Sequence, residues 1–235
     1  MIDLRLLLRR QTLLANLAQI FLGLGCMQAG QMLSLFWQQP RWTGSGFGLS
    51  AAGAGWLFLA LYSTSVIASP WSGYIGTRHG ARRSGCIGAL LTVIAWIAMA
   101  VSHHSYVAVL GAALVNILGV AVMHTAVYNL IVEVTPAERT GEAVGVAYIS
   151  FIVALAIGSQ ILFTILNSSI VGGGASSAGR YPTDRAFTTA FLYMAFMCAA
   201  SLVTLAAMPR TRTAASGGSQ VPRRAGPVPG CTDVG

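Results

Sequence analysis

Uncharged apolar stretches recur along this chain, and the charged residues are confined to the segments between them and to the two ends. Six such stretches contain no Asp, Glu, Lys or Arg. A helix needs about 20 apolar residues to cross the ~30 Å hydrocarbon core of a bilayer. Since backbone groups in hydrocarbon must pair within their own segment, the stretches predict transmembrane helices. They cover residues 13–37, 53–77, 84–101, 106–132, 143–166 and 186–208.

The predicted fold is therefore an all-α membrane protein with six transmembrane helices in one domain, residues 13–208. Residues 1–12 are predicted to form a basic cytoplasmic lead-in. Residues 209–235 are rich in Pro, Gly and Ser, a composition that cannot bury a core, and they predict a disordered cytoplasmic tail. The polar segment 167–185 is expected to be a flexible connector on the other side of the membrane.

Arginine is distributed unequally between the two sides that six spans define. The side that holds both termini carries 11 arginines, whereas the other side carries 3. Positively charged loops and ends are retained in the cytoplasm. The sequence thus predicts a multi-pass protein of the plasma (inner) membrane, with both termini cytoplasmic.

The overall composition supports a membrane protein and excludes several function classes. The chain is 55% hydrophobic and 9% charged, whereas a soluble domain carries about 25% charged residues. Every basic residue is Arg, which excludes the lysine-dependent chemistry of P-loop ATPases and Schiff-base enzymes. The net charge of +8 is explained by arginines at the ends of apolar stretches, so no nucleic acid partner is predicted. The expected partners are the lipid bilayer and a small-molecule solute, and no cofactor is expected.

Cysteine and histidine patterns give little support for a metal site or an enzyme. The four cysteines form no C-x-x-C pair and are interpreted as small packing residues. The adjacent pair His103 and His104 could ligate a metal at the surface, but without further ligands a polar loop is the better interpretation. No paired carboxylates or nucleophile motif indicates catalysis.

The segment between the second and third stretches has the most specific pattern in the chain. Residues 73–83 read GYIGTRHGARR. This resembles the signature loop of the major facilitator superfamily, G-x-x-x-D-R-x-G-R-R, in which an acidic residue precedes the first arginine. Here one extra residue, Ala81, stands between Gly80 and the arginine pair. Thr77 stands in place of that acidic residue. The matching positions, which we predict to form a gating loop, are Gly73, Arg78, Gly80, Arg82 and Arg83.

Two further segments resemble the C-terminal half of the same superfamily. Residues 133–141 are similar to the cytoplasmic link between its tenth and eleventh helices, and residues 3–10 are similar to the central linker before its seventh helix. The resemblance is nearest to the proton-driven drug-efflux branches. A complete member has twelve or fourteen helices in two halves, and solute binds between the halves.

The resemblance implies that this chain is one half of a transporter that works by alternating access. The expected activity is proton-coupled efflux of drugs or small molecules, together with a second six-helix half or as a homodimer. The alternative is a non-transporting membrane fragment or an assembly protein for other membrane proteins.

Polar residues within the apolar stretches are the candidates for a solute cavity, since polar groups in hydrocarbon tend to face a cavity or another helix. The resemblance implies that the first and fourth helices line the cavity, which favours Gln28, Gln31, Asn116 and His124. The alternative is that these side chains join helices to one another. His124 lies deep within a span and can carry a proton near neutral pH. No carboxylate lies mid-span, so an acidic proton carrier is expected on the other half.

Overall fold

Long apolar helices make up most of the residues that the structure describes, 10–172 and 180–208 in this computed structural model. Six of the helical segments are long and apolar enough to cross a membrane. The predicted fold class is therefore confirmed. The lead-in and tail stay predictions, because residues 1–9 and 209–235 lie outside the described residues. The elements are α2 (Arg10–Leu24), η1 (Cys26–Gln28), α3 (Ala29–Gln38), η2 (Arg41–Thr43), α4 (Ala51–His79), α5 (Ala81–Ser102), α6 (Tyr106–Val134), η3 (Ala137–Arg139), α7 (Thr140–Asn167), β1 (Ile170–Gly172), β2 (Arg180–Pro182) and α8 (Asp184–Ala207).

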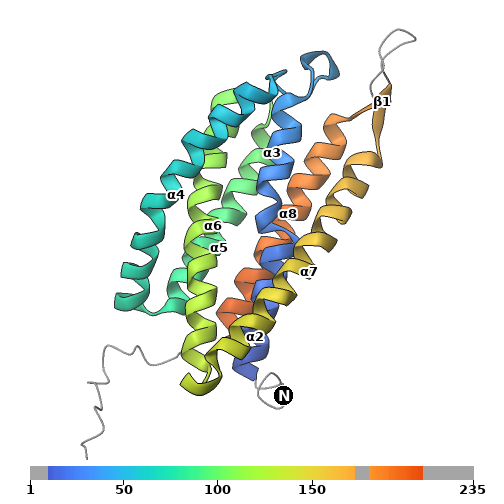
Figure 1. Cartoon of the computed structure of the whole chain (residues 1–235). Coiled ribbons are helices and arrows are strands. Elements are labelled where there is room, and N and C mark those ends of the chain that lie inside the picture. The colour runs from blue at the N-terminus through green and yellow to red at the C-terminus, as the bar shows by residue number, and fades with distance from the viewer. Residues whose placement is uncertain (1–9, 173–179, 209–235) are drawn as a thin grey trace, which may run out of the picture.

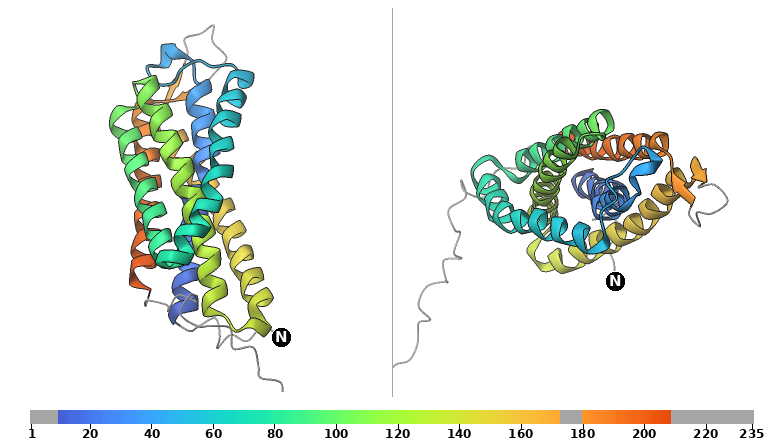
Figure 2. Two further views of the ribbon diagram at one scale, coloured as in Figure 1. Left: turned by 90° about the vertical axis from the view of Figure 1, so that its left-hand side faces the viewer. Right: turned by 90° about the horizontal axis from the view of Figure 1, so that it is seen from above.

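The helices are arranged around the first span, which is formed by α2 and α3 together (Figure 1). The second part of this span lies near the centre of the bundle when it is seen from above (Figure 2). Helix α5 packs on α6 and α8, α2 packs on α7 and α8, and α4 packs mainly on α6. The start of α2, the α4–α5 turn and the α6–α7 link share one end of the bundle (Figure 1). The predicted arginine-rich segments between spans therefore do lie together, although the membrane face that they occupy stays a prediction.

Large aromatic side chains form the centre of the bundle, while the outer faces are also largely apolar. Trp37 and Trp96 are fully buried together with phenylalanines of α3 and α8. Exposed apolar residues include Val66 on α4, Val107 on α6 and Val203 on α8. A surface of this kind is stable in lipid but would aggregate in water.

The first span is not the single helix that its sequence predicts, because it breaks at Gly25. Helix α2 ends at Leu24, and a short 3₁₀ turn separates it from α3. A Cβ atom at Gly25 would lie 2.3 Å from Cβ of Met197, so this glycine allows α8 to approach the break closely. Two carbonyl groups at the break are satisfied from nearby side chains. The Gln28 side chain donates to the Gly23 oxygen at 3.1 Å, and the Tyr193 hydroxyl donates to the Leu24 oxygen at 3.0 Å.

The predicted loop 73–83 is reduced to a single residue between two helices. Helix α4 continues to His79 and α5 begins at Ala81. Gly80 joins them with φ +89° and ψ 143°, a conformation that side chains with a Cβ atom rarely adopt. A glycine is therefore required at this turn, and it sets the direction of α5 relative to α4.

Replacing Gly80 with alanine is expected to lower the free energy of unfolding by about 1–3 kcal/mol, the usual cost of one strained backbone residue. The matched control is Gly76→Ala in α4, where an added Cβ meets nothing within 4 Å. This control should lose no stability, since alanine favours helix by up to about 1 kcal/mol over glycine. The measurement is unfolding in detergent followed by circular dichroism. Equal stability of the two variants would contradict the assigned turn.

The segment between α7 and α8 is more ordered than the predicted flexible connector. Strands β1 and β2 form an antiparallel pair in which Val171 lies opposite Tyr181. The expectation was wrong for these strand residues because backbone pairing overrides a polar, glycine-rich composition. Residues 173–179 lie outside the described part of the chain.

Candidate functional site

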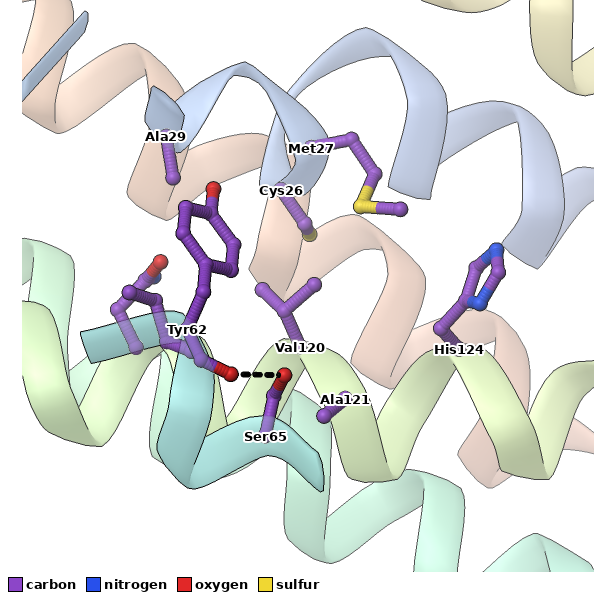
Figure 3. Close-up of a pocket in the computed structure, with 10 residues that line it drawn as sticks. Cys26, Met27, Ala29, Tyr62, Ser65, Val120, Ala121 and His124 are labelled. Carbon is purple, nitrogen blue, oxygen red and sulfur yellow. Dashed lines mark hydrogen bonds between the residues drawn. The ribbon is translucent and has the colours of Figure 1, made fainter. Parts of the chain in front are cut away.

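A pocket of about 170 Å³ lies between the broken first span, α4 and α6 (Figure 3). Helix α4 contributes Tyr62 and Ser65 to its wall. The break in the first span brings its 3₁₀ turn to the opposite wall, where Met27 points inward (Figure 3). The full lining is Cys26, Met27, Ala29, Tyr62, Ser65, Asn116, Ile117, Val120, Ala121 and His124.

Asn116 is the most unusual residue of the pocket wall. Its side chain is fully buried, and within the described residues neither its amide oxygen nor its amide nitrogen has a hydrogen-bond partner. A buried polar group without a partner costs about 1–3 kcal/mol, so such groups need a specific explanation. A bound polar molecule in the pocket would provide the missing partner.

The remaining polar residues of the pocket are uncharged hydroxyls and one imidazole. The Ser65 hydroxyl donates to the Tyr62 backbone oxygen at 2.6 Å (Figure 3). The ring of His124 lies 5.0 Å from that of Tyr128 and 5.7 Å from that of Phe151, measured between centroids. Chemically, the pocket fits a small molecule with an apolar body and one or two hydrogen-bonding groups.

Two of the four residues predicted for a solute cavity line this pocket, and two lie elsewhere. Asn116 and His124 are in the wall. Gln28 is buried but links the break to α7, since its side chain donates to the Leu155 oxygen at 2.8 Å. Gln31 is exposed and absent from the lining. For Gln28 the alternative interpretation, a link between helices, describes the geometry that the structure shows.

Sequence reasoning missed the contribution of α4 to the pocket. Tyr62 and Ser65 are separated by one helical turn and therefore share a face. Two polar side chains on one face of an apolar span were the available signal. This signal was not distinctive, because Ser63 and Thr64 lie between them and place hydroxyl groups on other faces of the same helix.

The residues of the predicted gating loop hold the ends of three helices together. Arg82 donates to the Leu205 oxygen at 3.2 Å and also to the Ala206 oxygen, at the C-terminal end of α8. The Arg78 guanidinium lies 4.6 Å from the centre of the Tyr74 ring. Arg83 is exposed, and a Cβ added at Gly73 would meet nothing within 4 Å. The structure thus gives Arg82 and Gly80 definite positioning roles at this end, whereas gating itself stays a prediction.

Arg82→Gln is expected to lower the free energy of unfolding by about 1–2 kcal/mol, since charge-assisted hydrogen bonds to the carbonyls of a helix end are lost. The matched control Arg83→Gln should leave stability unchanged, because that side chain is exposed. Thermal unfolding of the purified protein in detergent measures both. An unchanged melting temperature for Arg82→Gln would show that these contacts do not hold α5 to α8.

Helices α4 and α7 have the least buried surface of the six spans. In the most apolar 18-residue stretch of each span, 18% of the residues are buried in α4 and 28% in the span that contains α7. The two helices lie along the same side of the bundle when it is seen from above (Figure 2). Their exposed side chains include Trp56, Val66, Ile149 and Val153. The bundle therefore has one sparsely packed apolar side, and α4 also forms part of the pocket wall.

Comparisons with known proteins agree with this architecture. The family model described as Major Facilitator Superfamily matches residues 20–230. The chain is similar in fold to the proton:xylose symporter XylE of the major facilitator superfamily, solved with bound 6-bromo-6-deoxy-D-glucose. That match has a TM-score of 0.59 and 18% sequence identity, and it covers 84% of this chain and 43% of the symporter. Comparison with curated protein sequences gave no match.

Proposed function

The chain belongs to the major facilitator superfamily, and we propose that it acts in that family as one six-helix half of a secondary transporter. It is a multi-pass membrane protein whose family and fold are those of a transporter, not of an enzyme. The solute binds in the pocket between η1, α4 and α6. The observation that carries this proposal is the buried, unpartnered amide of Asn116 in the pocket wall.

The solute is a small, largely apolar molecule with a group that hydrogen-bonds to Asn116. Within the described residues, no Asp, Glu or Arg lines the pocket. A sugar carries several hydroxyl groups, each of which needs a partner when it leaves water, whereas most of the lining, including Met27, Ile117 and Val120, is apolar. The lining therefore supports a drug-like solute over a sugar. Because Asn116 is fully shielded in this conformation, binding requires a small opening of the pocket.

The second half is another six-helix unit of the same fold, which docks against the side formed by α4 and α7. Two observations support this partner. The chain covers 43% of the length of the xylose symporter, as one of two halves would, and the side next to the pocket is the least buried. The second half is either a separate chain or a second copy of this chain, and the mass of the purified complex distinguishes the two.

Transport proceeds by alternating access, in the direction of efflux and coupled to protons. Rocking of the two halves opens and closes the end that contains Gly80 and Arg82, which acts as the inner gate. The protein lies in the plasma membrane with both termini in the cytoplasm, and the arginine distribution supports this orientation. The proton carrier is an acidic residue on the second half.

The test measures ethidium and D-xylose flux into proteoliposomes that hold the chain together with its second half or as a homodimer. We expect saturable ethidium flux that is driven by an imposed pH gradient and abolished by a protonophore, with no xylose flux. Xylose flux without ethidium flux would overturn the drug-like solute. Flux equal to that of empty liposomes with both preparations would support the alternative, a non-transporting membrane fragment or assembly protein.

The same assay tests the inner gate. Arg82→Gln should reduce ethidium flux severalfold, whereas ethidium binding at equilibrium should stay within twofold of the unmodified protein. Unaltered flux in both Arg82→Gln and Gly80→Ala would contradict a gating role for this turn.

A further inference from the structure

A cluster of three metal-ligating side chains lies at the end of the bundle opposite the Gly80 turn. His103 and His104 follow the last residue of α5, and Asp184 is the first residue of α8. One ligating atom from each residue lies within 4.8 Å of the other two. Asp184 is 81 positions away from His103 in the sequence, so the fold supplies the further ligand that the two histidines lack on their own.

The imidazole of His103 is held in a fixed orientation by the backbone. Its Nδ1 atom lies 3.2 Å from the carbonyl oxygens of both Met99 and Ala100. Carbonyl oxygens only accept hydrogen bonds, so Nδ1 must carry the proton and donate it. In the neutral ring, Nε2 then has a free lone pair.

That lone pair points directly at a carboxylate. Nε2 of His103 lies 2.7 Å from Oδ1 of Asp184. Two electron-pair donors at this distance repel each other unless a cation, either a proton or a metal ion, lies between them. A histidine whose Nδ1 donates to a backbone carbonyl while Nε2 is free has the arrangement typical of metal ligands.

We propose that His103, His104 and Asp184 form a binding site for a divalent transition-metal ion, with Zn²⁺ as the best-matched ion. Two imidazole nitrogens and one carboxylate oxygen are a donor set that Zn²⁺ accepts, and water completes its four-coordinate shell. Late first-row ions such as Ni²⁺ and Cu²⁺ also prefer imidazole. Mg²⁺ and Ca²⁺ prefer oxygen ligands and should bind poorly.

The observed geometry requires only small adjustments to hold such an ion. Bonds of about 2.0–2.2 Å place neighbouring ligand atoms of a tetrahedral zinc site roughly 3.3 Å apart. The Nε2–Oδ1 pair at 2.7 Å must therefore widen slightly, and the most distant ligand atom must move inward. His104 is exposed, so its side chain can turn toward the ion at little cost, while the buried His103 stays fixed.

The site joins two segments that meet only in the folded protein. The ion would connect the turn between α5 and α6 to the first residue of α8. Asp184 has 44% of its side chain exposed, so the ion can enter from water at this end of the bundle. Zinc binding should therefore stabilise the folded chain.

The test is a Zn²⁺ titration of the full-length protein, purified in detergent without a polyhistidine tag. We expect one equivalent of Zn²⁺ to bind and to raise the melting temperature, with no competition from Mg²⁺ or Ca²⁺. His104→Ala should weaken binding at least tenfold and abolish the thermal shift. His79→Ala, a substitution at the last residue of α4, serves as the matched control and should bind zinc normally.

Asp184→Asn should weaken binding to a similar degree, and Co²⁺ absorption spectra show whether any remaining ion has lost a ligand. His104→Ala keeps the proposal testable if Asp184→Asn fails to fold, because His104 is exposed. Equal zinc affinity of the unmodified protein and His104→Ala would overturn the proposal, as would the absence of one-equivalent binding. The cluster would then be a proton-mediated contact between His103 and Asp184.

Discussion

Asn116→Leu is expected to lower the affinity of the protein for ethidium at least tenfold, while its stability stays the same or increases. The amide of Asn116 has no hydrogen-bond partner among the described residues, so leucine of similar size removes a desolvation cost of about 1–3 kcal/mol. The solute, however, loses the polar group to which it binds. Equilibrium binding by fluorescence, together with unfolding of the same preparation, measures both effects.

Asn129→Leu is the matched control for Asn116→Leu. It makes the same replacement on the same helix, at an exposed position outside the pocket. Its ethidium affinity should stay within twofold of the unmodified protein. Equal losses of affinity in both variants would indicate a general effect on α6, and retained affinity in Asn116→Leu would rule out the amide as a solute ligand.

Gly158→Val is expected to destabilise the protein at least as much as Gly80→Ala or Arg82→Gln. A Cβ atom at this position of α7 would lie 2.4 Å from the Leu24 oxygen and 2.8 Å from the Gln28 side-chain nitrogen. Backbone atoms of the broken first span would have to move. Overpacking of this kind costs about 3 kcal/mol at the upper end of its usual range. Because the 3₁₀ turn forms one wall of the pocket, ethidium binding should fall as well.

Gly145→Val on the same helix provides the comparison. A Cβ there would meet nothing within 4 Å, so this variant changes only the intrinsic helix propensity. Gly158→Val carries the same change in propensity. The difference in unfolding free energy between the two variants therefore isolates the packing of α7 against the break. If both variants lost stability equally, close packing at Gly158 would be contradicted.

The membrane-spanning helices could be predicted almost completely from the sequence. Hydrophobicity is a local property, and a stretch such as 106–132 meets the length requirement of a bilayer without reference to any neighbour. The candidates Asn116 and His124 could be named for the same reason, since a polar residue within a span is conspicuous on its own. The superfamily was also accessible from the sequence, through the spacing of Gly80 and Arg82 in one short segment.

Only the tertiary structure decided which residues come together at each site. Helix rotation determines that Tyr62 faces the pocket and that Gln31 does not. Helices α7 and α8 approach the first span closely where it breaks at Gly25, and the arrangement of α5 and α8 brings Asp184 to His103. Local sequence sets which segments enter the membrane, because transfer from water depends on each segment's own composition. The residues that contact each helix face depend on packing between helices that are distant in sequence, and no local sequence pattern encodes these contacts.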